Sequence, residues 1–98
     1  MVKGTTSSGF SFEIPEGLDN DFRFVKSYEM TFSGDEEKAI KGVVKLVSAI
    51  FANNEEEEER LYEHLGKKYN GRVPFDVLFD EIKEIIDLAK SSDESIKN

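Results

Sequence analysis

The chain has 98 residues, of which 38% are hydrophobic and 11% aromatic, so it can form one small domain with a modest core. Its formal net charge of -8 argues against a nucleic-acid binder, because phosphate contacts depend on Lys and Arg. The absence of cysteine excludes disulfide scaffolds, zinc-thiolate sites and thiol enzymes. No apolar run is long enough to cross a bilayer, and the N-terminus lacks the apolar stretch of a secretory signal. We therefore expect no membrane partner and no export.

The N-terminal segment combines a polar stretch with a short alternating one. Residues 1–8 are rich in Thr, Ser and Gly, and we expect them to form a flexible arm. After them, Phe10, Phe12 and Ile14 alternate with polar residues, and the run stops at Pro15. This alternation predicts a short strand, which must pair with another strand or lie extended across helices.

The segment from Asp19 to Phe32 fits two kinds of secondary structure. Its large apolar residues recur near helical spacing at Phe22, Val25, Tyr28 and Phe32, and Asp19 or Asn20 is available as an N-cap. Aromatic and apolar residues in the same segment also alternate as in a strand, interrupted by Lys26. Periodicity alone does not separate helix from strand over residues 21–32.

Residues 35–52 are predicted to form an amphipathic helix. Acidic residues occupy its first turn, where the helix dipole favours negative charge. Its apolar stripe consists of Ile40, Val43, Val44, Val47, Ile50 and Phe51. Gly42 within this pattern lowers helix propensity, which suggests close packing against a neighbouring element.

Two further helices are predicted in the C-terminal half. Asn53 and Asn54 end the preceding helix and cap the next one, whose first turn is the acidic run 55–59. A turn is predicted at Asn70-Gly71, and the last helix begins near Pro74. Its apolar stripe comprises Phe75, Leu78, Phe79, Ile82, Ile85, Ile86 and Ala89, opposed by Asp80, Glu81, Lys83, Glu84 and Asp87.

These elements predict a mainly α fold, a small bundle of three to four amphipathic helices with a short extended or β segment at the N-terminus. We expect a flexible arm over 1–8, a single helical domain over 9–90 and a flexible tail over 91–98. Phe51, Phe75 and Phe79 are candidates for the core, because aromatic side chains supply large buried area to small domains.

No group of residues in the sequence predicts catalysis. The run 55–59 lacks the alternating ligands and central glycine of a common calcium loop, so we interpret it as a solvated helix start. His64 has Arg60 and Lys68 four residues away on either side, and no carboxylate one turn away to orient it as a base. The pair Asp76 and Asp80 is interpreted as an exposed acidic flank. We expect no enzyme, no cofactor and no metal site, and the sequence assigns no residues to the binding of a protein partner.

The order of these segments resembles the tail assembly chaperones of long-tailed bacteriophages of Gram-positive hosts. The resemblance is carried by TTSSGFSFEIPEGLDNDFRFVK at the start, GVVKLVSAIFANNEEEEERLYEHL in the middle and LYEHLGKKYNGRVPFDVLFDEIKEII at the end. It extends roughly from Thr5 to Leu88. Its most specific elements are the Gly-aromatic-x-Phe-Glu-Ile opening and the turn from Asn70 to Pro74.

The resemblance implies a mainly helical fold and favours helix for Asp21 to Tyr28. It also implies a role in virion assembly in the host bacterial cytoplasm: the chaperone coats the tape measure protein and keeps it soluble until the tail tube polymerises around it. In many such phages a longer, frameshifted product recruits the tail tube protein. The implied partners are thus the tape measure protein, the tail tube protein through such a product, and further copies of the chain as a homo-oligomer.

A second functional hypothesis follows from the charge distribution. Residues 55–98 contain thirteen acidic and seven basic side chains, a net charge of -6. An acidic inhibitor that mimics DNA and blocks a host nucleic-acid-binding protein would use such a surface. It would need Glu55 to Glu59 and the flank of Asp76, Asp80, Glu84 and Asp87 to form one continuous strip.

Overall fold

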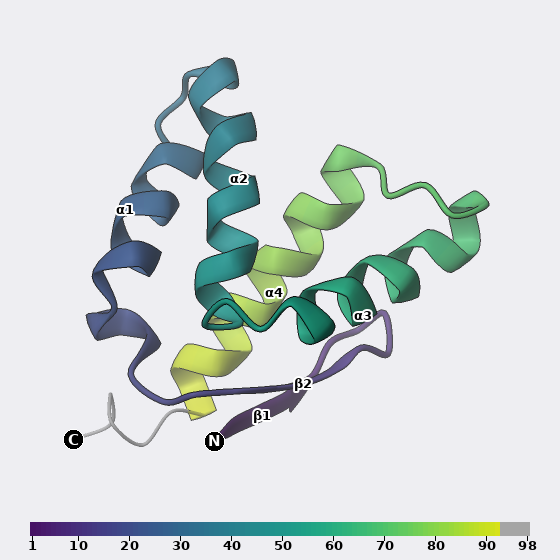
Figure 1. Ribbon diagram of the computed structural model, residues 1–98, viewed down its shortest axis with the longest axis horizontal. Helices are drawn as coiled ribbons and strands as arrows, with labels where there is room; N and C mark the ends of the chain where they lie inside the picture. Colours follow the sequence, from purple (N-terminus) through teal and green to yellow (C-terminus); the bar gives the residue numbers. More distant parts are fainter. Residues whose placement is uncertain (93–98) are drawn as a thin grey trace.

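The computed structural model describes residues 1–92 of the chain as a bundle of four helices with an N-terminal β-hairpin (Figure 1). The elements are β1 (Val2–Thr5), β2 (Ser11–Ile14), α1 (Phe22–Thr31), α2 (Glu36–Ile50), α3 (Glu55–Gly66) and α4 (Phe75–Ser92), with 3-10 turns at Leu18–Asn20 and Lys67–Tyr69. The prediction of a small, mainly helical bundle with an N-terminal β segment is confirmed.

The N-terminal strand and its partner form an antiparallel hairpin. β2 covers the predicted strand, and Val2 pairs with Ile14 while Thr5 pairs with Ser11. The prediction of a flexible arm over 1–8 is wrong, because residues 2–5 form β1 and the side chains of Val2 and Thr6 are buried. The physical reason is that β2 cannot stand alone, so β1 supplies the backbone partners that it needs.

The ambiguous segment forms helix α1, as the resemblance implied. The carboxylate of Asp21, not Asp19 or Asn20, caps the helix by accepting a hydrogen bond of 2.9 Å from the Arg23 amide. The hydroxyls of Ser27 and Thr31 lie on the buried face and donate to carbonyls one turn earlier, each over 2.7 Å. Small hydroxyl residues thus form much of the buried face, which is why the hydrophobic pattern alone did not identify the helix.

Helices α1 and α2 form an antiparallel pair that is held at close distance by Gly42 (Figure 1). A Cβ atom at Gly42 would lie 2.6 Å from the backbone nitrogen of Thr31, so only glycine fits between the two helices here. The close packing inferred from the sequence is therefore confirmed. At the start of α2 the carboxylate of Asp35 accepts a hydrogen bond from the Lys38 amide.

The C-terminal half follows the predicted turns. Asn54 caps α3 through a hydrogen bond from the Glu57 amide, and the acidic run forms the first turn of the helix as predicted. Asn70 and Gly71 both have positive φ and form the predicted turn before α4. Helix α4 continues through Ser92, so the predicted tail begins two residues too early. Residues 93–98 of that tail lie outside the described residues.

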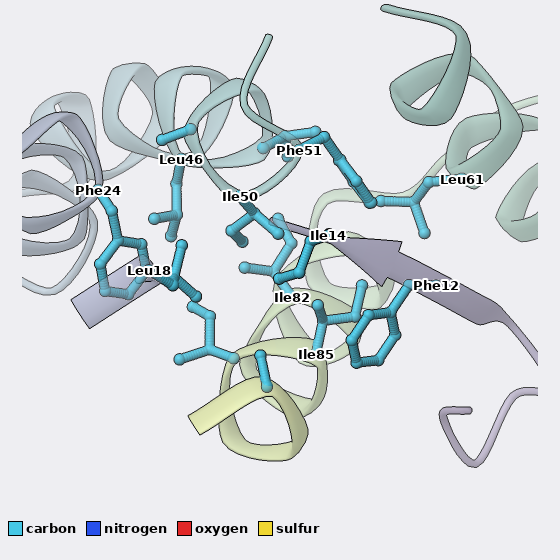
Figure 2. Packing of buried hydrophobic residues seen from close by; sticks show 14 of the residues in the cluster. Phe12, Ile14, Leu18, Phe24, Leu46, Ile50, Phe51, Leu61, Ile82 and Ile85 are labelled. Carbon is cyan, nitrogen blue, oxygen red and sulfur yellow. The ribbon is translucent and has the colours of Figure 1, made fainter. Parts of the chain in front are cut away.

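The core lies where the hairpin meets the four helices (Figure 2). Figure 2 shows side chains from β2, α2, α3 and α4 converging, namely Phe12, Ile14, Leu46, Ile50, Leu61, Ile82 and Ile85. The predicted core residue Phe51 is buried, and Phe79 is partly buried against the same cluster.

Three predicted apolar-stripe residues lie outside this core. Phe75 is 46% exposed because it begins α4, at the end of the helix remote from the hairpin (Figure 1). Ile40 and Val44 of α2 are also exposed, since they lie on the side of the helix that turns away from the buried Leu46 and Ile50. The buried face of α2 is therefore displaced around the helix relative to the predicted stripe, and it includes Gly42, Leu46 and Ala49.

Candidate functional site

Five aromatic side chains from α1 and α4 make a chain of ring contacts, which we call the aromatic strip. It runs from Phe24 through Tyr28, Phe32 and Phe79 to Phe75. The successive ring centroids are separated by 5.6, 4.5, 5.3 and 5.9 Å. These separations lie within the range in which aromatic pairs attract one another, so the strip is one continuous surface rather than five isolated rings.

The strip begins in the core and ends in solvent. The Phe24 ring is buried and Phe79 is partly buried, whereas Tyr28, Phe32 and Phe75 are 38%, 39% and 46% exposed. The three exposed rings form an apolar surface that is already held in position, because the partly buried Phe79 ring contacts both Phe32 and Phe75 and the buried Phe24 ring contacts Tyr28. Such a surface can bind a partner without first ordering flexible side chains.

Two lysines of α4 border the strip. The ammonium group of Lys90 lies 5.8 Å from the Phe24 ring centroid and 5.4 Å from that of Tyr28. Lys83 lies 5.7 Å from the centroid of Phe79. These distances permit cation–π attraction, which holds the aliphatic stems of both lysines beside the rings. The Lys90 ammonium group also pairs with the Asp19 carboxylate over 3.3 Å, so the positive charge at that edge of the strip is partly balanced.

Sequence analysis missed this surface. The sequence does show aromatic residues spaced one helical turn apart within each helix. The pairs are Tyr28 with Phe32 and Phe75 with Phe79, and the members of each pair share a helix face. The contact between Phe32 and Phe79 joins two helices that are distant in the chain, and no local pattern predicts it. Phe75 and Phe79 were instead assigned to the core.

A polar cluster joins the hairpin turn to α4, although the sequence placed Glu81 on the polar side of that helix. The Glu81 carboxylate is buried and accepts hydrogen bonds from the hydroxyls of Thr6 over 2.7 Å and Ser8 over 2.9 Å. The neighbouring carboxylate of Glu84 accepts from the amide and hydroxyl of Ser7. These contacts anchor the turn of the hairpin on the last helix.

His64 lies at the edge of this cluster. Its Nε2 atom is 3.1 Å from both the hydroxyl and the carbonyl oxygen of Ser8, and its ring packs on Phe10. In a nucleophile–base–acid arrangement the carboxylate orients the histidine, but here Glu81 contacts Ser8 instead. His64 is thus a half-buried residue at the boundary between core and surface, held by hydrogen bonds to Ser8.

A metal site needs several carboxylate or imidazole groups that converge on one point. Within residues 1–92, no group of three or more His, Asp or Glu side chains is arranged to hold a metal ion. Asp76 and Asp80 are exposed on α4, and the carboxylate of Glu58 accepts a hydrogen bond of 2.9 Å from Ser48. Among the same residues, no helix combines the length and apolarity needed to cross a membrane.

The chain was compared with protein families, curated proteins and solved structures. No protein-family model matches the chain, and neither a curated protein nor a solved structure matches it significantly.

Proposed function

We propose that the chain is a tail assembly chaperone of a long-tailed bacteriophage, which binds the tape measure protein in the host cytoplasm and keeps it soluble. The proposal rests on the resemblance of the sequence segments and on one structural observation, the exposed aromatic strip of α1 and α4. It includes the tail tube protein as a further partner of a frameshifted product, and homo-oligomers or many copies of the chain along one client.

The aromatic strip has the properties that a helix-binding chaperone needs. An amphipathic helix binds through apolar residues one turn apart, and rings spaced along two helices offer matching contacts. Tyr28, Phe32 and Phe75 provide large contact area at low entropic cost, because they already pack on one another or on Phe79.

The net charge supports the same role. A chain of net charge -8 repels other copies at long range, which favours solubility of a complex that carries a long apolar client. The acidic first turn of α3 contributes to this charge and remains largely exposed. The apolar side chains that would bind the client are thus concentrated on the strip, whereas the charges that favour solubility lie on other parts of the surface.

Co-expression with the tape measure protein tests the proposal. The client should be soluble and co-purify with the wild-type chain, and the triple variant Tyr28→Ser, Phe32→Ser, Phe75→Ser should lose most of this effect. Phe22→Ser is the matched control, because Phe22 is 76% exposed on α1 but makes no ring contact with the strip. If the client neither associates nor changes solubility with the wild-type chain, the proposal is wrong.

The alternative of a DNA mimic is less well supported by the side-chain contacts. Three of the carboxylates that it would present already bind internal partners: Glu57 pairs with Arg60, Glu58 accepts from Ser48, and Glu84 holds Ser7. Reversing Glu56, Glu57 and Glu58 to Lys separates the two proposals. If the client binds to the aromatic strip, this variant should still bind it. If the chain is a DNA mimic, the variant should no longer inhibit the host nucleic-acid-binding protein.

A further inference from the structure

A second surface lies between α1 and α2, on the other flank of α1 from the aromatic strip. It is a groove of about 310 Å³, lined by Arg23, Lys26, Ser27, Val44, Lys45, Ser48, Ala49 and Asn53. Arg23 and Tyr28 are five residues apart in α1, which places their side chains about 140° apart around the helix axis. A partner in this groove would not compete for the strip.

Positive charge gathers around this groove on a chain whose net charge is -8. Arg23, Lys26 and Lys45 are exposed, and among residues 1–92 none of the three forms a salt bridge. Ser48 also lines the groove, and its hydroxyl donates a hydrogen bond of 2.9 Å to the Glu58 carboxylate. The two helices thus present three exposed cationic groups that can pair with the carboxylates of a partner.

The floor between these cations is apolar in character. Ala49 and Ser27 are buried, and the Ser27 hydroxyl is satisfied by donating to the carbonyls of Arg23 and Phe24. On the rim, Val44 is 63% exposed and adds an aliphatic side chain to the surface of the groove. The two helices that form the groove pack closely, with Gly42 of α2 against Met30 and Thr31 of α1.

We infer that this groove binds an acidic amphipathic segment of a partner protein, in which an aliphatic side chain lies between carboxylates about one helical turn apart. The aliphatic side chain would contact Val44 and Ala49. The carboxylates would pair with Arg23 and Lys26 of α1 and with Lys45 of α2, and Arg23 can hold a carboxylate through two hydrogen bonds.

Charge and shape favour a protein ligand over a nucleic acid. A polyanion would be repelled by the net charge of -8, and three cations around an apolar floor are too few to follow a phosphate backbone. An acidic peptide carries fewer charges and offers the aliphatic group that the floor can accommodate. The inference concerns a different face from the proposed client surface and does not depend on it.

A designed peptide tests this inference on the full chain. The probe is a fluorescein-labelled helix longer than about 15 residues, with Leu at positions i, i+3 and i+7 and Glu beside them. A matched peptide carries Lys in place of Glu. Binding is followed by fluorescence anisotropy, and the contact surface is mapped from backbone amide shifts in nuclear magnetic resonance spectra.

The acidic peptide should bind, shift the amides of residues 23–27 and 44–49, and bind at least about tenfold more tightly than the basic peptide. The double variant Arg23→Glu, Lys45→Glu should weaken binding about tenfold or more, whereas Lys68→Glu, Arg72→Glu makes the same charge change elsewhere and should preserve it. The inference is overturned if the acidic peptide does not bind, if both variants bind alike, or if single-stranded DNA occupies the groove more tightly.

Discussion

The hydroxyl of Thr6 donates a hydrogen bond of 2.7 Å to the buried carboxylate of Glu81, and so joins the first turn of the chain to its last helix. The two residues are 75 positions apart. Ser8 donates to the same carboxylate oxygen, which leaves the buried Glu81 with two hydroxyl partners. A buried carboxylate without such partners would be strongly destabilising, so the hairpin turn and α4 need one another.

Replacing Thr6 with Val should lower the free energy of unfolding by about 1–3 kcal/mol, because the buried Glu81 carboxylate loses one of its two hydroxyl donors and the Phe10 amide loses the Thr6 hydroxyl as an acceptor. Urea denaturation followed by circular dichroism measures this loss. The matched control is Thr5→Val, whose hydroxyl contacts Ser11 at an exposed position and should change stability by less than about 0.5 kcal/mol. Equal effects of the two substitutions would contradict the role of the Thr6 contact.

Gly42→Ala should destabilise the protein by about 1–3 kcal/mol, although alanine has the higher helix propensity. The added methyl group would lie 2.6 Å from the Thr31 nitrogen and 2.9 Å from the Met30 carbonyl carbon, so α1 would have to move. Thermal unfolding of the single variant measures the effect. Adding Thr31→Ala should not restore stability, because the closest atom belongs to the backbone; full rescue would show that the side chain alone was responsible.

Two phenylalanines of the predicted core should differ sharply in their contribution to stability. Phe51 is buried and packs edge-on against Phe10 at 6.4 Å, so Phe51→Ala should cost about 3–5 kcal/mol. Phe75→Ala should cost less than about 1 kcal/mol, because nearly half of that side chain is exposed. Chemical denaturation of both variants checks the contrast, and a large loss for Phe75→Ala would place that ring in the core after all.

The free energy of unfolding is expected to depend on pH under alkaline conditions because of Tyr62. Burial raises the pKa of its hydroxyl, and the carboxylates of Glu58 and Glu59 raise it further. The native state therefore keeps the phenol proton to higher pH than the unfolded chain, in which tyrosine titrates at about 10. The stability that the neutral phenol contributes is complete below that pH and is lost as pH rises through the native pKa.

Tyr62→Phe removes this titration. The variant should match the wild type in unfolding free energy near neutral pH, because the Tyr62 hydroxyl makes no hydrogen bond among the described residues. Above a pH of about 10, its stability should decline less steeply than that of the wild type. Urea denaturation over pH 8 to about 11 compares the slopes, and parallel curves would show that Tyr62 does not contribute to the decline.

Several local features of the fold could be predicted from the sequence. The acidic first turns, the asparagines before α3, the turn at Asn70 and Gly71 and the alternation through Phe12 and Ile14 all lie in the predicted places. Each acts over a few residues, through a cap, a positive φ or the direction of neighbouring side chains. Gly42 likewise indicated close packing without naming the helix that it meets.

Other features depended on contacts between distant segments. A polar stretch became β1 because β2 and the carboxylates of α4 lie beside it, and Glu81 was buried because Thr6 and Ser8 reach it. The contact between Phe32 and Phe79 likewise exists only once α1 and α4 are packed. The sequence by itself determined α2, α3 and α4 and the places where they begin, because caps, acidic first turns and turn residues act locally. The tertiary structure decided which faces are covered, because burial depends on neighbours that no local pattern specifies.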